Sequence, residues 1–530
     1  MITSEINPAA YQLVPLSKIA CNGLNGLLIA DGVGLGKTIS ATYIAVYFSE
    51  VFRLPTGVIC SPVLVTKWLT ELRSKFKVPA FAVRSREDMT TAMHEAKLRP
   101  SNFYIISNSL LATNSDLEHP MLGTLLIDEI QSFRNNKTKS YASVLKIARQ
   151  SRLRIGLSAT PINNTLNDLS SELAILLAEE NWDAVSAFVS DLWSWKRTRI
   201  TTPLVTRFVK NKLGMHFARR HVQLLEVKLP EDFRHTVERT LERAYHSVNI
   251  YEVVTYLRMA ASCPSLFIRK FHLNGTLKTE DQKPRIVQTT LEKSTISHWL
   301  VFVEFEGTAR FLASGIEDRP VFVITGRTPI FERDDIIESF RESDKGILIL
   351  TPVGSEGLDL QFCQGVINYD LHWNPMKIEQ RIGRIDRIGQ SKSQIEIVNI
   401  RVLGSIDDRV LQVILSKLDL TERSIFATDE IVLPSRMKAS SVQQRAVESE
   451  LDQSKQLISA IRYSDQIGQE DYGLLRSINT SYCRMPELKE AARRAPLECL
   501  WLTHDGTSIK WQERIRTEAN EFRAGLESYR

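Results

Sequence analysis

The sequence predicts an α/β fold with two parallel-sheet lobes, helical insertions between them and a helical C-terminal extension. Short continuous apolar runs alternate with helical patterns before about residue 165 and again after about residue 290. Continuous apolar runs, rather than strictly alternating ones, are typical of strands buried on both faces of a parallel sheet. The stretch between them is helical in pattern with few strand-like runs. It therefore separates two lobes of the α/β layer type.

Two groups of apolar runs supply the expected strands. In the first lobe they are GLLIAD (26–31), GVICSP (57–62), NFYIISN (102–108), TLLIDE (124–129) and RIGLSAT (154–160). In the second lobe they are WLVFVEF (299–305), PVFVITG (320–326), GILILTP (346–352), GVINYDL (365–371) and IEIVNIRV (395–402). Segments such as ISATYIAVYFSEVF (39–52) carry apolar residues at helical spacing and are expected to connect the strands.

The expected domain boundaries follow these changes of pattern. A chain of 530 residues is too long for one ordinary hydrophobic core. Residues 1–222 are predicted to form the first lobe, with a helical insertion near 165–215. Residues 223–290 form a helical linker or protrusion, and residues 291–425 form the second lobe. Residues 426–530 are a polar, helical extension that contains no motif with an evident role.

Composition and charge narrow the class of protein. The net charge of +5 permits a nucleic-acid partner, but an even spread of the surplus charge is an equal alternative. The six cysteines form no C-x-x-C pair, which favours neither a zinc site nor a disulfide framework and fits a reducing cytoplasm. The start, MITSEINPAAYQL, lacks a signal-peptide pattern, and no apolar run is long enough to span a bilayer. We therefore expect no membrane partner.

A glycine-rich segment, DGVGLGKT (31–38), lies between a strand and a helix and predicts a phosphate-binding loop. Gly34 and Gly36 let the backbone curl so that N–H groups at a helix N-terminus point at an anion. Lys37 suits the β- and γ-phosphates of ATP, and the Thr38 hydroxyl suits Mg²⁺. Asp31 stands where the common pattern has its first glycine, and we include it in the nucleotide site. A plain glycine-rich turn before a helix is the alternative.

The acidic pair in DEIQ (128–131) follows an apolar strand, at the edge where parallel sheets bind ligands. Asp128 suits the Mg²⁺ shell, directly or through water. Glu129 suits the general base that orients the attacking water. A solvated acidic turn is the alternative, and the phosphate loop upstream argues against it.

The second lobe supplies positive charge in QRIGRIDRIGQ (380–390). Gln380, Arg384 and Arg387 follow the spacing Q-x-x-G-R-x-x-R, and the two arginines would share one face of a helix. Such arginines stabilise a transferring phosphoryl group, as an arginine finger does. The alternative is a salt-bridged surface helix, because Asp386 lies between them.

Taken together, the motifs resemble the Swi/Snf-type ATPase family of the superfamily-two helicase fold, whose two lobes are RecA-like. In motif style the chain is most similar to bacterial members, including an ATPase that recycles RNA polymerase. The segments that carry the resemblance, beyond the phosphate loop and DEIQ, are Tyr11–Gln12, SPVLVTKWLTEL (61–72), LSATPINN (157–164), FARR (217–220), LRMAASCPSLF (257–267), ITGRTPIFERDDIIESF (324–340), GSEGLDL (354–360) and YDLHWNPMKIEQRIGRIDRIGQ (369–390).

The resemblance implies further roles. Tyr11 and Gln12 would read the adenine of ATP, and Gly357, Asp359 and Gln380 would contact the nucleotide from the second lobe. Residues 404–420 resemble the bracing helix that follows that lobe, and part of 165–290 would form helical protrusions.

Three positions depart from the family pattern. Gln131 replaces a usual histidine, so it keeps hydrogen-bonding capacity but cannot titrate. Ser158 and Ala159 replace a Thr-Gly pair. Asp359 replaces a common asparagine and could accept a bond from the ATP ribose.

The resemblance also implies double-stranded DNA as a partner, gripped mainly through phosphates because a motor must tolerate every sequence. The candidate contacts are Pro62, Lys67, Trp68, Arg327, Thr328, Thr351, Gly354 and Ser355. Loop or core packing is the alternative for each of them, and for Trp68 packing is the favoured interpretation.

The sequence thus predicts a DNA-dependent ATPase of the bacterial cytoplasm, associated with the nucleoid, that uses ATP and Mg²⁺ to move along duplex DNA. Its target would be a DNA-bound protein, such as RNA polymerase, or a partner in a defence system. A strand-separating DNA or RNA helicase is one alternative. A non-catalytic scaffold, or a partner-dependent component of a bacterial defence system, is another.

Overall fold

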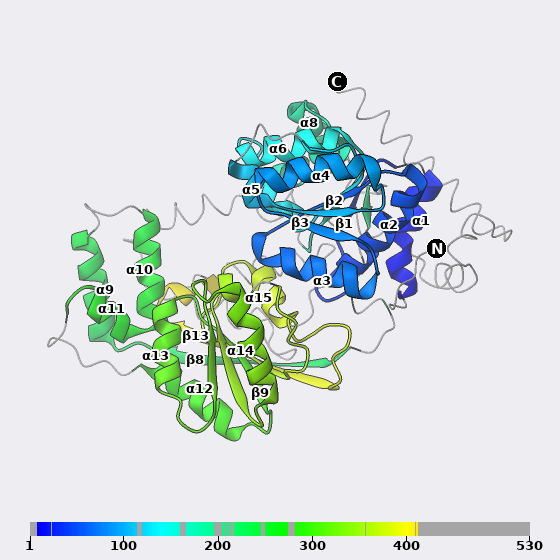
Figure 1. Cartoon of the computed structure of the whole chain (residues 1–530). Coiled ribbons are helices and arrows are strands. Elements are labelled where there is room, and N and C mark those ends of the chain that lie inside the picture. The colour runs from blue at the N-terminus through cyan, green and yellow to red at the C-terminus, as the bar shows by residue number, and fades with distance from the viewer. Residues whose placement is uncertain are drawn as a thin grey trace. The chain divides into compact units, whose positions relative to one another are not determined.

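The computed structural model describes residues 8–22, 24–113, 119–159, 166–195, 204–206, 208, 210, 213, 217–244, 250–273, 281–355, 357–408 and 410–411. Contacts divide the chain into two compact units, with the change of unit between Met215 and His216, and each unit holds one sheet (Figure 1). Most of the predicted bracing helix, all of the predicted C-terminal extension and residues 160–164 of LSATPINN lie outside the described residues.

The first lobe is built on a 7-stranded sheet in the order β3-β4-β2-β5-β6-β1-β7, and every neighbouring pair is parallel. Its strands are β1 (Gly26–Ile29), β2 (Thr56–Cys60), β3 (Ala80–Val83), β4 (Phe103–Ser107), β5 (Leu122–Ile127), β6 (Ser151–Leu157) and β7 (Val205–Thr206). Its helices are α1 (Ala10–Asn22), α2 (Lys37–Phe52), η1 (Pro62–Leu64), α3 (Val65–Lys75), α4 (Arg86–Leu98), α5 (Asn108–Thr113), η2 (Ile130–Phe133), α6 (Lys139–Arg149), α7 (Leu166–Leu177) and α8 (Trp182–Trp195).

The second lobe has a 6-stranded sheet in the order β10-β11-β9-β12-β13-β8, again with every neighbouring pair parallel. Its strands are β8 (Arg219–Lys228), β9 (His298–Phe302), β10 (Val321–Ile324), β11 (Gly346–Leu350), β12 (Gly365–Asn368) and β13 (Gln394–Leu403). Its helices are α9 (Glu231–Ala244), α10 (Ile250–Ser262), α11 (Pro264–Lys270), α12 (Gln282–Lys293), α13 (Glu306–Ser314), α14 (Ile330–Glu342), η4 (Val353–Ser355) and α15 (Pro375–Ile382).

The predicted fold class is confirmed, and each predicted apolar run overlaps a strand. The central strands β1, β2, β4, β5 and β11 are buried along their whole length, as continuous apolar runs require. Two short strands of the first lobe, β3 and β7, were not predicted: β3 is a run of only four apolar residues, AFAV, and β7 has two residues.

A third unpredicted strand, β8, changes where the chain passes from one lobe to the other. It pairs in register with the whole of β13, from Arg219 opposite Gln394 to Lys228 opposite Leu403. The predicted first lobe ran to residue 222, whereas β8, which begins at Arg219, belongs to the second unit. β8 is an edge strand with mostly half-buried or exposed positions, so its sequence, RRHVQLLEVK, lacks the continuous apolar character of the central strands.

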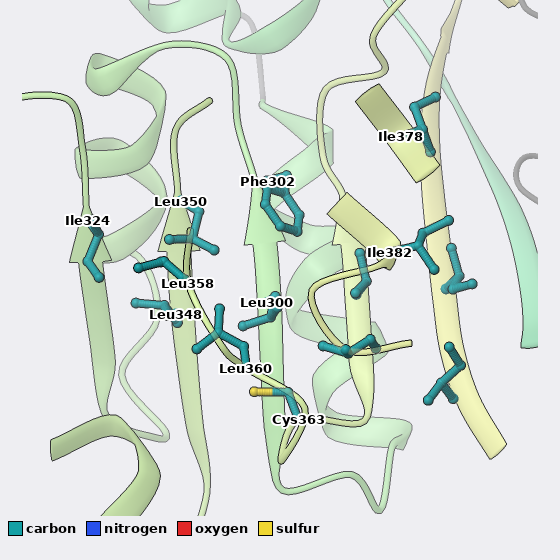
Figure 2. Packing of buried hydrophobic residues seen from close by; sticks show 14 of the residues in the cluster. Leu300, Phe302, Ile324, Leu348, Leu350, Leu358, Leu360, Cys363, Ile378 and Ile382 are labelled. Atoms are coloured by element: carbon teal, nitrogen blue, oxygen red, sulfur yellow. The ribbon is translucent and has the colours of Figure 1, made fainter. Parts of the chain in front are cut away.

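One face of the second sheet anchors the motif segments of that lobe. Figure 2 shows this core, in which strand residues pack against residues of α15 and of the 354–360 segment. The labelled residues are Leu300, Phe302, Ile324, Leu348, Leu350, Leu358, Leu360, Cys363, Ile378 and Ile382. Burial of a large apolar side chain contributes about 1.5–3 kcal/mol. These contacts therefore fix both motif segments to the strands beneath them.

Helices α9, α10 and α11 share a separate small core that includes Phe233, Val253 and Phe267. This arrangement agrees with the helical character predicted for the middle of the chain. Within the described residues, no helix combines the length and apolarity that crossing a membrane requires.

Candidate functional site

The loop between β1 and α2 is shaped by two left-handed glycines. Gly34 has φ +81° and Gly36 has φ +75°. The backbone conformation of Gly36 favours glycine, and a Cβ there would lie 2.6 Å from Nε2 of Gln12, so the Gln12 side chain would have to move. Lys37 begins α2, and its Nζ donates to the backbone oxygen of Asp31 at 3.0 Å. The Lys37 ammonium and the N-terminus of α2 thus lie next to the same loop, as the sequence predicts for a phosphate site.

Tyr11 and Gln12 brace this loop. The Tyr11 hydroxyl and Nε2 of Gln12 both donate to the backbone oxygen of Leu35, at 2.6 and 3.0 Å. Oε1 of Gln12 accepts from the backbone N–H of Ala9 at 3.0 Å. Burial, together with the Asp31 carboxylate, raises the pKa of Tyr11, which keeps its hydroxyl a donor. Both side chains therefore hold the loop, and adenine recognition by them stays a prediction.

A third support for the loop was not predicted. Phe208 donates its backbone N–H to Oδ1 of Asp31 at 2.8 Å, and its carbonyl accepts from the N–H of Gly32 at 2.8 Å. The Phe208 ring lies 5.4 Å from that of Tyr11. Asp31 is fully buried, and one of its carboxylate oxygens is used in this structural bond. Its role in nucleotide binding stays a prediction.

The acidic pair follows β5, as the sequence predicts. Oδ1 of Asp128 accepts from the backbone N–H of Glu129 at 3.0 Å, and Oδ2 accepts from the indole N–H of Trp68 at 2.9 Å. Burial, and then the neighbouring Glu129 carboxylate, raises the pKa of Asp128 to about 6. The Trp68 bond and the Lys37 ammonium oppose that rise, because both favour the ionised form. Lys37 and Asp128 therefore act on each other electrostatically.

Gln131 has a specific contact in this site. Its Nε2 donates to Oε2 of Glu129. Glu129 has φ +48°, a left-handed conformation that costs a non-glycine residue free energy. The glutamine that departs from the family pattern thus keeps a hydrogen bond to the predicted general base.

A buried carboxyl lies near the acidic pair. Glu172, on α7, is fully buried, and neither of its carboxyl oxygens has a hydrogen-bond partner among the residues that the structure describes. Burial, and then the charges of Asp168 and Glu129, raises the pKa of Glu172 well above its usual value. The protonated form is therefore favoured there. No local sequence pattern indicates this group, because it is one acidic residue in an amphipathic helix.

In the second lobe, the predicted shared helical face of Arg384 and Arg387 is wrong. Helix α15 ends at Ile382, and the chain continues in turns as far as Gly389. The fully buried Ile385 anchors these turns to the core, and Nε2 of Gln390 donates to the Ile385 carbonyl at 3.0 Å. Both arginines thus lie in a turn that the core holds in place. Gln380 alone of the three predicted residues lies on the helix, where it is half-buried.

Ion pairs organise this turn. Arg387 donates to Oδ1 of Asp359, so the two predicted nucleotide contacts are paired with each other. Asp386 is buried and pairs with Arg220 of β8 at 2.6 Å. Arg220 also donates two bonds of 2.7 Å to the Glu379 carboxylate. The alternative of a salt-bridged surface helix does not hold for Asp386, because its partner comes from a different element and both groups are buried.

Comparison with protein families covers both lobes. Residues 13–264 match the SNF2-related domain, and residues 282–389 match the helicase conserved C-terminal domain. Together the two matches span more than half of the chain, in the order of the two lobes. The chain is an SNF2-related ATPase.

Individual relatives are distant. The chain is 25% identical to the uncharacterized ATP-dependent helicase YqhH of Bacillus subtilis, over 81% of this chain and 81% of the relative. It is 22% identical to the putative ATP-dependent helicase/translocase YwqA of the same organism, over 76% of this chain but only 46% of that protein. Among solved structures it is similar to the Sulfolobus solfataricus SWI2/SNF2 ATPase core in complex with dsDNA. That match has 20% identity and a TM-score of 0.37, and covers 79% of this chain and 93% of the other.

The predicted DNA contacts of this SNF2-related ATPase differ in exposure. Pro62 is exposed, and Arg327 is exposed and paired with Glu306 at 3.2 Å. Lys67 and Thr328 are half-buried, and the Thr328 hydroxyl accepts from the N–H of Thr325.

The remaining candidates are buried in the SNF2-related ATPase. Thr351, Gly354 and Ser355 are buried beside β10, and a Cβ on Gly354 would lie 2.6 Å from the Ile324 carbonyl oxygen. Trp68 is 2% exposed, so packing rather than nucleic-acid contact accounts for its side chain.

The first lobe of the SNF2-related ATPase suits ATP with Mg²⁺. The loop has two left-handed glycines, Gly34 and Gly36, and the Lys37 ammonium donates to the loop carbonyl of Asp31. The Thr38 hydroxyl, in the first turn of α2, and the Asp128 carboxylate are the oxygen donors that Mg²⁺ prefers beside substrate phosphates.

Proposed function

We propose that the chain is a motor that couples ATP hydrolysis to movement along double-stranded DNA and thereby remodels or displaces protein–DNA complexes. The observation that carries the proposal is the joint placement of Lys37, Asp128 and Glu129 beside one loop, in a chain of the SNF2-related family. The relative YwqA, named a helicase/translocase, supports movement along a nucleic acid as the output.

The residues of the first lobe take distinct roles. Lys37 neutralises phosphate charge, and Thr38 and Asp128 hold Mg²⁺, which when bound withdraws charge from the β- and γ-phosphates. Glu129 orients the attacking water and accepts its proton. Gln131 holds the Glu129 carboxylate through its amide, so this support does not change with pH.

The second lobe contributes positive charge. Arg384 and Arg387 stabilise the transferring phosphoryl group, which places ATP between the two lobes when it is hydrolysed. Gly357, Asp359 and Gln380 contact the nucleotide from the same lobe. Binding then favours a closed arrangement and hydrolysis releases it, which would move the DNA if each lobe grips the duplex.

The grip on DNA is proposed for exposed and half-buried members of the candidate set. Pro62, Lys67 and Arg327 reach phosphates through side chains or nearby backbone N–H groups. Thr351, Gly354 and Ser355 contribute through the shape of the turn that they form, since their side chains are buried. The target is a DNA-bound protein, such as RNA polymerase, or a defence-system partner in the bacterial cytoplasm.

The test is steady-state ATP hydrolysis by the purified protein without nucleic acid and with duplex DNA, single-stranded DNA or RNA. Duplex DNA is expected to stimulate hydrolysis, and Glu129→Gln is expected to lower the rate by about 10²–10⁴-fold, the usual contribution of a general base. Displacement of a third strand from a triplex, without separation of the duplex, would support translocation.

Two results favour the alternatives. Stimulation by single strands or RNA only, with separation of a duplex, favours a helicase, the function named for YqhH. Absence of hydrolysis under every condition favours a scaffold or a component that needs a partner.

A further inference from the structure

The hydrogen bond between Trp68 and Asp128 joins two segments that are 60 residues apart in the sequence. Trp68 lies on α3 and is buried with Val65 and Leu72 on the inner face of that helix. Its indole Nε1 donates to Oδ2 of Asp128 at 2.9 Å. A Trp side chain has a single donor, and here it is directed at the predicted metal-binding carboxylate.

Both oxygens of that carboxylate are held from the protein side. Oδ1 accepts from the backbone N–H of Glu129 at 3.0 Å, and Oδ2 accepts from Trp68. Two donors on two oxygens fix the rotation of the carboxylate about its Cβ–Cγ bond, and each oxygen keeps a lone pair for another ligand. Hydrogen bonds to an ionised group in a buried site are stronger than neutral ones.

The residue before Trp68 on the same helix, Lys67, is less buried. Successive residues of an α-helix are about 100° apart around its axis, so Lys67 and Trp68 point in different directions. Lys67 is half-buried and Trp68 is fully buried. One turn of α3 therefore carries a proposed DNA contact and a hydrogen bond to Asp128.

We propose that Trp68 is a positioning residue through which α3 sets the orientation of the Asp128 carboxylate for Mg²⁺, so that ATP hydrolysis responds to what α3 contacts. This inference rests on the proposed function, because it assigns Mg²⁺ to Asp128 and DNA to α3. The competing explanation is that the Trp68 ring only fills the core.

Two variants separate these explanations. Trp68→Phe keeps an aromatic ring in the core but removes the N–H donor. Leu72→Ala is the matched control, because it removes apolar packing from the same face of α3 and leaves the hydrogen bond in place. Thermal unfolding of both variants measures how much core packing each one loses.

The activity test titrates Mg²⁺ at saturating ATP, with and without duplex DNA. Trp68→Phe is expected to raise the half-saturating Mg²⁺ concentration, or to lower kcat, by about 10- to 100-fold, the usual effect of removing a partner of a metal ligand. It is also expected to reduce the stimulation by DNA. Leu72→Ala should keep the wild-type Mg²⁺ requirement and kcat. If Trp68→Phe changes neither the Mg²⁺ requirement nor kcat more than Leu72→Ala does, the proposal is wrong.

A spectroscopic test does not depend on turnover. The chain has eight tryptophans, and in protein labelled with 5-fluorotryptophan the ¹⁹F resonance of Trp68 is the one that Trp68→Phe removes. This resonance is expected to shift with ADP and Mg²⁺, not with ADP and EDTA, and to shift in Asp128→Asn. A resonance that is unchanged both with ADP and Mg²⁺ and in Asp128→Asn overturns the inference. A wild-type protein that binds nucleotide but hydrolyses no ATP would contradict the proposed function, and this resonance would still decide the role of Trp68.

Discussion

The two lobes hold their charged site residues in different ways. In the first lobe the hydrogen bonds that orient the charged groups come from neutral groups: Lys37 donates to a backbone carbonyl, and Asp128 accepts from a backbone N–H and an indole N–H. In the second lobe Arg387 is paired with the carboxylate of Asp359. Neutral partners orient a group without cancelling its charge, whereas an opposite charge must be exchanged before the group can serve a ligand. The first lobe is thus oriented in advance, and the second must change partners.

The largest expected effect tests whether the second lobe supplies catalytic charge. Arg384→Ala and Arg387→Ala are each expected to lower the rate of ATP hydrolysis by about 10³-fold or more, because an arginine finger stabilises the transition state. ATP affinity, measured with a fluorescent analogue, should change much less. Arg149→Ala is the control, since this arginine is exposed and paired with Glu180. Equal losses of affinity and rate would instead make the arginines ordinary binding residues.

A smaller effect on the rate of ATP hydrolysis is expected when the ion pair between Arg387 and Asp359 is removed. Asp359→Asn removes the charge that pairs with Arg387 and restores the residue common in the family. Exposed ion pairs are worth about 0.2–1 kcal/mol, so the basal rate of ATP hydrolysis is expected to rise by about 1.5- to 5-fold. Steady-state kinetics decide the matter. A basal rate that does not rise would show that Asp359 does not restrain Arg387, and a higher KM for ATP would support the proposed contact of Asp359 with the nucleotide.

The smallest effect concerns the buried acid of the first lobe. The pKa of Glu172 is higher in the folded state than in the unfolded state. Its protonated form therefore stabilises the folded protein fully at a pH below the unfolded-state pKa. This stabilisation is lost as the pH rises through the folded-state pKa. Glu172→Gln cannot ionise, so its thermal midpoint should fall less than that of the wild type between about pH 5 and pH 8. Each kcal/mol corresponds to about 2–4 °C in a lobe of this size. Glu180→Gln, at an exposed position, should follow the wild-type curve, and a Glu172→Gln curve parallel to the wild type would contradict the assignment.

The sequence predicted what depends on local pattern. Buried parallel strands leave continuous apolar runs, and the phosphate loop and acidic pair lie at strand ends where such sheets bind ligands. It did not predict β8, because an edge strand needs no continuous apolar run. It also gave a helix to Arg384 and Arg387, since spacing alone does not show that a buried Ile385 turns the chain after Ile382.

Contacts between distant segments account for the rest. Phe208 and Glu172 lie in no motif, and Gln131 lies in DEIQ with no partner indicated by the sequence, so the roles of all three appear only when their neighbours are in place. The bond from Trp68 to Asp128 is of the same kind, because the sequence favoured burial of the ring but did not indicate the partner of its N–H group.

The brace supplied by Phe208 has a consequence for biosynthesis. The phosphate loop is complete in sequence by residue 38, yet the residue that binds Asp31 comes 177 positions after it. At the usual pace of 5–20 residues per second, a ribosome needs about 10–35 s to make that stretch. During this time β7 cannot pair with β1, and Phe208 cannot donate its hydrogen bond to Asp31. A chain released earlier would contain the phosphate-loop motif without these contacts.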